Sequence, residues 1–290
     1  MPFLVMGSLF VVVDVLALLL VGPFSGAGLY AFEDSGDPVD VVYFAAMMVV
    51  TTGVILALRR FRKGVLVRWV MLGAIWFSLF STLYTLSWFM LGDFLAVGVS
   101  ALLSLGLVYL LVRWRRWYII DTAAVLLGAV TTTVLGISLS PPLTAALLLL
   151  LTVYDAIAVY KTKHMLTLAE TILDSGLPLV LIVPRGGYVE GGNVDIVKGS
   201  SQGERRAYYM GLGDLIIPGC LVVSIYSTMG SVGLPIIVAV LLGTLVGFAV
   251  LSVLVARGKP QAGLPFLCGG AVMGYVVSSY LLFEGLVVLL

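Results

Sequence analysis

Apolar residues fill long runs of this chain, and polar residues gather in short segments between them. The runs without Asp, Glu, Lys or Arg are residues 15–32, 41–58, 69–92, 94–112, 122–154, 215–256 and 260–283. A bilayer core about 30 Å thick needs roughly 20 helical residues, so each run is long enough for a membrane-spanning helix. The two longest runs are divided by turn-forming residues, at 138–142 and 230–235.

The pattern predicts an all-α membrane protein, a polytopic bundle of nine transmembrane helices. Backbone groups facing lipid must be satisfied within the segment, which favours helices over strands. The expected spans are 3–22, 39–58, 65–86, 92–112, 118–137, 142–160, 208–229, 235–256 and 262–283.

The segment 161–207 is the one long polar stretch, and it divides the chain into three expected parts. Residues 1–160 form six helices, 161–207 a mobile cytoplasmic loop, and 208–290 three helices. Within the loop we expect an amphipathic helix at 164–175, a strand-like apolar run at 177–183 and a glycine-rich charged stretch at 185–206.

Composition supports the membrane interpretation. Apolar residues make up 61% of the 290 residues and charged residues 11%, and the mean hydropathy is +1.16. A soluble domain carries about 25% charged residues. The 16 basic and 15 acidic side chains are too few to cover a globular surface. This excludes an ordinary soluble enzyme, a disordered chain and a nucleic-acid binder with a basic surface.

Cysteine and histidine add little chemistry. Cys220 and Cys268 lie in apolar stretches and are interpreted as packing residues without a disulfide framework. The single histidine, His164, excludes a histidine-based metal site, and we expect neither a metal nor a cofactor. The N-terminal apolar run lacks a basic region and is too long for a cleaved signal peptide, so a retained span is expected.

Charge placement predicts the orientation. All 16 Lys and Arg residues lie in the segments 59–68, 113–116, 161–206 and 257–259. With nine alternating spans these segments share one side of the membrane. The only charged residues in the opposite loops are acidic: Glu33, Asp34, Asp37, Asp93 and Glu284. The positive-inside rule places the basic side, and with it the N-terminus, in the cytoplasm and the C-terminus outside. The expected location is the cell membrane, with multiple passes.

Five aspartates fall within or at the ends of the spans: Asp14, Asp40, Asp121, Asp155 and Asp214. A carboxylate at membrane depth costs about 2.5–3.5 kcal/mol on insertion scales, so each needs a reason. Asp40 and Asp121 are expected in the first turns of their helices, where they complement the helix dipole. Asp14 lies in the middle of its span, and the sequence does not decide between a structural and a functional role.

Asp155 and Asp214 are expected at similar depths. Asp155 precedes Lys161 by six residues and Asp214 follows Arg206 by eight, which places them roughly 9 and 12 Å inside the boundary on consecutive antiparallel helices. Two facing carboxyls share a proton, so that one activates water as a general base while the other polarises a carbonyl. Spacing alone leaves aspartic peptidase, proton transporter and structural pair open.

The flanking residues supply a resemblance. Tyr154 directly precedes Asp155, and Asp214 ends a Gly-Leu-Gly-Asp run at 211–214. The two signatures together, in this order, resemble those of the presenilin and signal peptide peptidase family of intramembrane aspartic peptidases. The segment 161–171 is also similar to the presenilin stretch after the Tyr-Asp helix. The resemblance implies that Asp155 and Asp214 are catalytic. It implies supporting roles for Tyr154, Gly211, Leu212 and Gly213.

The family's third signature, Pro-Ala-Leu before the last span, is altered. Ala262 and Gly263 stand where the family has Pro and Ala, whereas Leu264 and Pro265 fit its extended form. By analogy this stretch lines the site and helps to hold substrate. An irregular helix start is expected over 260–265, because irregular backbone is tolerated where it lines a cavity.

The cytoplasmic N-terminus fits the presenilin branch, and the short 161–207 loop resembles that of a microbial, archaeal homologue. The resemblance implies an endopeptidase that hydrolyses transmembrane helices within the bilayer, with no nucleic-acid partner. A substrate helix must enter sideways and unwind, and the run 177–183 either pairs with it as a strand or packs as a loop. Homo-oligomerisation is left open.

Three alternatives remain. A prepilin or preflagellin peptidase also uses Gly-x-Gly-Asp, but it lacks the Tyr-Asp helix. A proton-coupled transporter would use Asp14, Asp155 and Asp214 and predicts inverted repeats, which the sequence does not show to the eye. The third alternative is a scaffold without activity.

Overall fold

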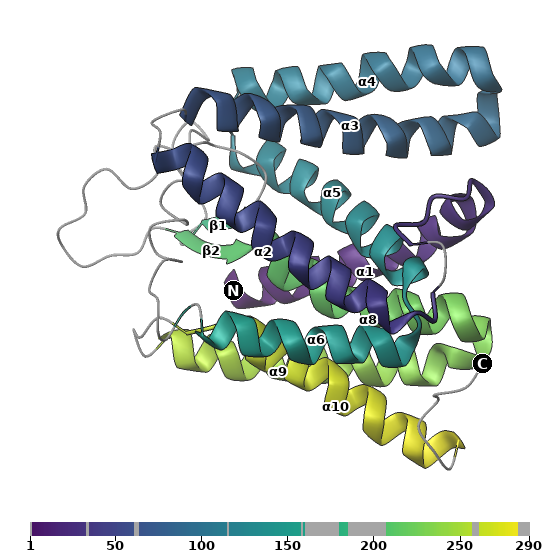
Figure 1. Cartoon of the computed structure of the whole chain (residues 1–290), viewed down its shortest axis with the longest axis vertical. Helices are drawn as coiled ribbons and strands as arrows, with labels where there is room; N and C mark the ends of the chain where they lie inside the picture. Colours follow the sequence, from purple (N-terminus) through teal and green to yellow (C-terminus); the bar gives the residue numbers. More distant parts are fainter. Residues whose placement is uncertain are drawn as a thin grey trace.

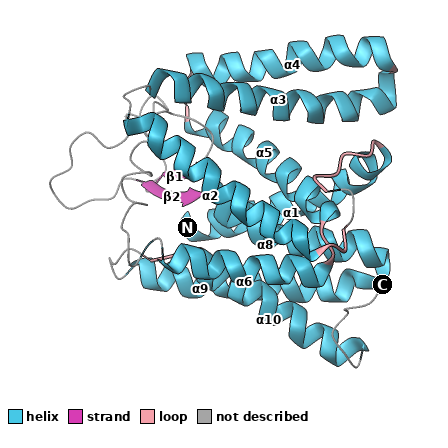
Figure 2. Ribbon diagram, in the orientation of Figure 1, coloured by secondary structure: helices cyan, strands magenta, loops and turns pink. Residues whose placement is uncertain are grey.

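The computed structural model of this chain describes residues 2–32, 35–60, 64–114, 116–157, 159, 180–184, 207–256 and 261–283. This part is a helical bundle with one small sheet (Figures 1 and 2). The helices are α1 (Pro2–Gly26), α2 (Pro38–Arg60), α3 (Gly64–Leu91), α4 (Asp93–Arg113), α5 (Trp117–Ser138), α6 (Pro141–Ile157), α8 (Leu212–Met229), the short 3-10 helix η2 (Gly230–Gly233), α9 (Leu234–Ala256) and α10 (Leu264–Phe283). The strands are β1 (Val180–Pro184) and β2 (Ala207–Gly211).

Each predicted span overlaps one of these helices, and most ends agree within a few residues. Six helical segments of the described residues are long and apolar enough to cross a membrane: Phe3–Gly26, Trp69–Trp88, Asp93–Arg113, Trp117–Ser138, Leu212–Val255 and Leu264–Leu282. Shorter apolar helices cover Pro38–Thr51 and Pro141–Ile157. The architecture is therefore that of an all-helical, multi-pass membrane protein. The helix expected at 164–175 and the stretch 185–206 lie outside the described residues.

One predicted helix start is wrong. The span expected from residue 208 begins as strand β2, and helix α8 begins only at Leu212. β2 pairs antiparallel with β1 in a register that places Val180 opposite Gly211 and Pro184 opposite Ala207. Tyrosines favour a strand here, and the glycine at 211 disfavours a helix. The strand expected at 177–183 is observed from Val180, and residues 177–179 are not described.

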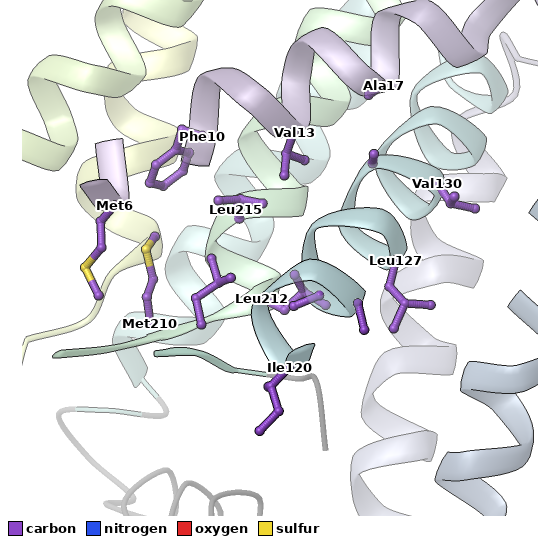
Figure 3. Close-up of a cluster of buried hydrophobic side chains, with 14 of the residues drawn as sticks. Met6, Phe10, Val13, Ala17, Ile120, Leu127, Val130, Met210, Leu212 and Leu215 are labelled. Carbon is purple, nitrogen blue, oxygen red and sulfur yellow. The ribbon is translucent and has the colours of Figure 1, made fainter. Parts of the chain in front are cut away.

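Helices α1, α5 and α8 form the centre of the bundle. Their side chains interdigitate in one buried cluster, which Met210 of β2 joins. Figure 3 shows Met6, Phe10, Val13, Ala17, Ile120, Leu127, Val130, Met210, Leu212 and Leu215. Small residues on α5 allow α8 to come close, because a Cβ on Gly136 would lie 2.9 Å from the carbonyl oxygen of Cys220. Thr133 ties α5 to α1, where its hydroxyl donates to the Ala17 carbonyl at 3.0 Å.

Helices α9 and α10 pack backbone to backbone. A Cβ on Gly243 of α9 would overlap the Gly270 carbonyl of α10, and a Cβ on Gly270 would overlap the Gly243 carbonyl. Gly247 approaches the carbonyl of Phe266 in the same way. This glycine seam holds the start of α10 in a fixed position. By contrast, α3 and α4 form a pair at one side of the bundle (Figure 1), and α4 leaves large apolar side chains such as Phe94 and Leu102 exposed, as a lipid-facing helix does.

Candidate active site

Asp155 lies in the last turn of α6 and is buried, with 4% of its surface exposed. Its Oδ2 accepts a hydrogen bond from the backbone N–H of Leu264 at 3.3 Å. Leu264 is the first residue of α10, and the N–H groups of a first helical turn lack partners within their own helix. The carboxyl of Asp155 therefore satisfies the start of α10, where the helix dipole favours a negative charge.

Asp214 lies in the first turn of α8, directly after strand β2. The depth estimated from the sequence assumed a helix running back to Arg206, and this assumption is wrong because residues 207–211 form the strand. Two glycines border the carboxyl. A Cβ on Gly211 would lie 3.5 Å from Asp214 Oδ2, and a Cβ on Gly263 would lie 2.8 Å from it. A Cβ on Gly211 would thus make an ordinary contact, whereas one on Gly263 would crowd the carboxyl, so it is Gly263 that leaves Asp214 room.

The structure brings the two aspartates together across the residues before α10. Asp155 hydrogen-bonds Leu264, Asp214 lies against Gly263, and the two carboxyls interact electrostatically. Three helices thus meet at one point: α6 contributes the first carboxyl, α8 the second, and the start of α10 touches both. Residues this far apart in sequence are held in place by the α9–α10 seam and by the packing of α6 on α10.

Residues 262–265, which contain the altered third signature, lie beside the two aspartates. Residues 261–263 are not helical, as expected, but the irregular stretch predicted to run to residue 265 ends earlier, because Leu264 and Pro265 already belong to α10. Ala262 and Leu264 are buried, whereas Gly263 and Pro265 are half-buried. Proline is tolerated in the first turn of a helix because no N–H is needed there, so Pro265 does not disturb α10. Residue 260 is not described.

Other predicted supporting residues lie around the pair. Leu212 is buried in the α1–α5–α8 cluster, whereas Gly213 is exposed and open on the side where a Cβ would project. Tyr154 is half-buried, and its hydroxyl makes no hydrogen bond to a described residue. Neighbouring helical residues point about 100° apart, so Tyr154 and Asp155 face different directions.

Sequence reasoning missed Cys268. This thiol is fully buried on α10, one turn after Leu264, the residue whose N–H donates to Asp155. The signal was present as a four-residue spacing on α10, which places Cys268 on the helix face of Leu264. Among the described residues, no group of three or more His, Cys, Asp or Glu side chains lies close enough together to hold a metal ion.

The remaining intramembrane aspartates lie away from this point. Asp40 is in the first turn of α2 as expected. Asp121 was also expected in a first turn, but α5 begins at Trp117, so Asp121 lies in the second turn and is buried. The prediction failed because α5 starts one residue before its apolar run suggested. Asp14 is buried at the α1–α5–α8 contact.

Comparison with known proteins agrees with this geometry. The family model described as signal-peptide peptidase, presenilin aspartyl protease matches residues 7–284. Two solved structures of a presenilin family intramembrane aspartate protease, in space groups P2 and C222, are each 33% identical to this chain and cover 97% of it. The TM-scores are 0.70 and 0.71, with 98% and 100% of those chains covered. A comparison with curated protein sequences found no match. The chain therefore belongs to the signal-peptide peptidase and presenilin family of aspartyl proteases and is an intramembrane aspartic endopeptidase.

Proposed function

We propose that Asp155 and Asp214 are the catalytic dyad of this peptidase. The observation that carries the proposal is that both carboxyls, from different helices, meet the adjacent residues Gly263 and Leu264. Two carboxyls at one point cannot both ionise without strong repulsion, so the pair holds one proton between them. A pair in this state supplies a general base and a general acid together.

The hydrogen bond from Leu264 suggests how the roles divide. Donation from a backbone N–H stabilises a carboxylate more than a neutral acid, so we assign the negative charge to Asp155 and the proton to Asp214. Asp155 then removes a proton from the attacking water, while Asp214 donates its proton to the scissile carbonyl oxygen. The tetrahedral intermediate collapses when Asp155 passes the proton it took from water to the leaving amine and Asp214 takes back a proton from a hydroxyl of the intermediate. The C–N bond breaks, a carboxylic acid forms, and the pair returns to its starting protonation state.

We further propose that the substrates are transmembrane helices of other proteins. A helical peptide bond is shielded by its own hydrogen bonds, so the substrate must unwind beside the dyad. Gly213 is exposed on the catalytic helix, and an exposed glycine allows a substrate backbone to come near Asp214. The β1–β2 sheet ends at Gly211, so an unwound segment added to its edge would arrive beside the carboxyl.

The proposed topology has nine spans with the N-terminus in the cytoplasm and the C-terminus outside, in the cell membrane. Support comes from the coincidence of the nine predicted segments with described helices. It also comes from the placement of all 16 basic residues in alternate connections between spans or at the helix ends beside them. In this arrangement 161–207 is a cytoplasmic loop between a six-helix part, 1–160, and a three-helix part, 208–290.

Cleavage by purified protein tests the dyad. A single-span substrate in lipid vesicles is incubated with the unaltered protein and with Asp155→Asn and Asp214→Asn, and products are identified by mass spectrometry. We expect each variant to lose at least about 10³-fold in kcat, since neither carboxyl can replace the other. Asp93→Asn is the matched control, because Asp93 also lies in a first helical turn, on α4.

Retention of cleavage by either dyad variant would refute the assignment. Proton flux through the vesicles, abolished by the same substitutions and accompanied by no cleavage, would instead favour the transporter. The topology is tested separately with cysteines placed between α2 and α3 and between α4 and α5, which a membrane-impermeant thiol reagent should label only from the cytoplasmic side.

A further inference from the structure

Asp14 is a buried carboxyl that the proposed dyad does not use. It lies midway along α1 with 3% of its surface exposed, and its Oδ1 has no hydrogen-bond partner among the described residues. Thr132 of α5 is fully buried, and its Oγ1 likewise has no partner among them. Since polar groups are expensive at membrane depth, two unpartnered groups at one helix contact call for an explanation.

Both side chains lie against Gly219 of α8. A Cβ on Gly219 would overlap Asp14 Oδ1, and it would lie 3.0 Å from Thr132 Cγ2 and 3.5 Å from Asp14 Cγ. The three helices of the central cluster therefore meet at this glycine. Thr132 turns its methyl group to the contact, and a rotation about its Cα–Cβ bond would direct its hydroxyl there instead. The hydroxyl would then be placed to donate to the Asp14 carboxyl.

The position of this contact on α8 links it to catalysis. Gly219 follows Asp214 by five residues, about 7.5 Å along the helix. Between them lies Pro218, which is buried and has no N–H, so the carbonyl of Asp214 lacks its usual partner four residues later. The first turn of α8 is consequently held less by its own hydrogen bonds than by its neighbours. Only five residues of one helix separate Gly219 from Asp214, so a rotation of α8 at Gly219 also changes the direction in which Asp214 points.

We propose that Asp14 is a positioning residue for the catalytic helix: its carboxyl, packed against Gly219 and able to accept a hydrogen bond from Thr132 once that side chain rotates, sets the rotation of α8 and thereby holds Asp214 opposite Asp155. This inference rests on the proposed dyad. Asp14 does not touch substrate and acts only through α8. Its size and its hydrogen-bonding oxygen matter, whereas a negative charge does not.

Mutual suppression tests the contact. Gly219→Ala forces a methyl group into the space of the Asp14 carboxyl. Because a displacement near 1 Å lowers a catalytic rate about 100-fold, we expect kcat to fall by about that factor. KM should change less than about threefold. Asp14→Ala alone should lower kcat by about tenfold. In the double variant the new methyl group occupies space that the carboxyl has left, so kcat should recover at least about tenfold relative to Gly219→Ala. Asp14→Asn keeps shape and hydrogen bonding and should stay within about threefold of the unaltered protein.

Two results would overturn the inference: a double variant no more active than Gly219→Ala, or an Asp14→Asn enzyme as impaired as Asp14→Ala. Gly98→Ala on α4, where a Cβ would meet nothing within 4 Å, is the control for a glycine substitution in a helix. Thermal unfolding in detergent restricts every comparison to folded protein. If Asp14→Ala does not fold, Asp14→Asn and Thr132→Val still test the inference. Thr132→Val removes the hydroxyl and should lower kcat severalfold without changing KM. An unchanged kcat for Thr132→Val would overturn the inference.

Failure of the dyad gives a different result. If Asp155→Asn or Asp214→Asn retains cleavage, the dyad is wrong irrespective of the Asp14 variants. If both dyad variants are inactive while the suppression fails, only the positioning role of Asp14 is refuted.

Discussion

Replacing Gly263 with alanine places a methyl group against the proposed catalytic carboxyl of Asp214. The added Cβ would lie 2.8 Å from Oδ2, 3.1 Å from Cγ and 3.3 Å from Oδ1 of Asp214. Ordinary van der Waals contact begins at 3.4 Å, so the carboxyl or the residues before α10 must move by about 0.6 Å. Since a 1 Å misplacement costs about 100-fold in rate, we expect Gly263→Ala to lower kcat by about tenfold, or about 1.4 kcal/mol.

The assay is steady-state cleavage of a fluorogenic single-span substrate, with kcat and KM determined separately. Gly213→Ala is an informative comparison, because a Cβ there meets nothing within 4 Å in the free enzyme. If substrate approaches the catalytic helix at Gly213, that substitution raises KM, whereas Gly263→Ala lowers kcat. An unchanged kcat for Gly263→Ala would refute the reasoning, because it would show that the contact with Asp214 is not maintained during catalysis.

Three further outcomes are expected. Gly270→Ala should lower the free energy of unfolding by about 1–3 kcal/mol, since its Cβ would overlap the Gly243 carbonyl, whereas Gly269→Ala meets nothing within 4 Å and should be neutral in the same thermal melt. Leu264→Pro removes the N–H that donates to Asp155 and should reduce kcat/KM by about 10–100-fold relative to Leu264→Ala. Equal kcat/KM values for the two variants would disprove a role for this hydrogen bond. Chelation with EDTA should leave the cleavage rate unchanged, because the proposed dyad chemistry uses no metal, and a rate restored by added zinc would contradict it.

The helices were predictable because a bilayer imposes a length on every crossing. Leu139 and Ser140 separate α5 from α6 within the break expected at 138–142, whereas α3 continues to Leu91, past its expected end at residue 86, before the chain turns at Gly92. The start of α8 was not predictable in this way. Tyr208 and Tyr209 are as apolar as many helical residues, and only pairing with β1 draws them into a strand. Pairing depends on a segment about 25 residues earlier in the chain, which a local hydrophobic pattern does not record.

The candidate site was likewise predictable in part. Asp155 and Asp214 stood out because a carboxylate within an apolar run needs a reason, and their flanking signatures supplied a resemblance. The part played by Gly263 could not be anticipated from its neighbours in sequence. It depends on the distance between α8 and the start of α10, which is set by the glycine seam between α9 and α10.

Asp14 shows most clearly what a sequence leaves open. Its burial could be inferred from its place in the middle of an apolar run, but its partner could not, because Thr132 and Gly219 lie on two other helices and are ordinary residues in such segments. The chain has 33 glycines, and composition does not distinguish the one that receives a carboxyl from those that face lipid. Packing makes that distinction: Gly98 of α4 is free to accept a side chain, whereas Gly219 is not. A third aspartate can therefore influence a two-aspartate site without approaching the substrate, because its contact at Gly219 and the catalytic Asp214 lie on the same helix, five residues apart.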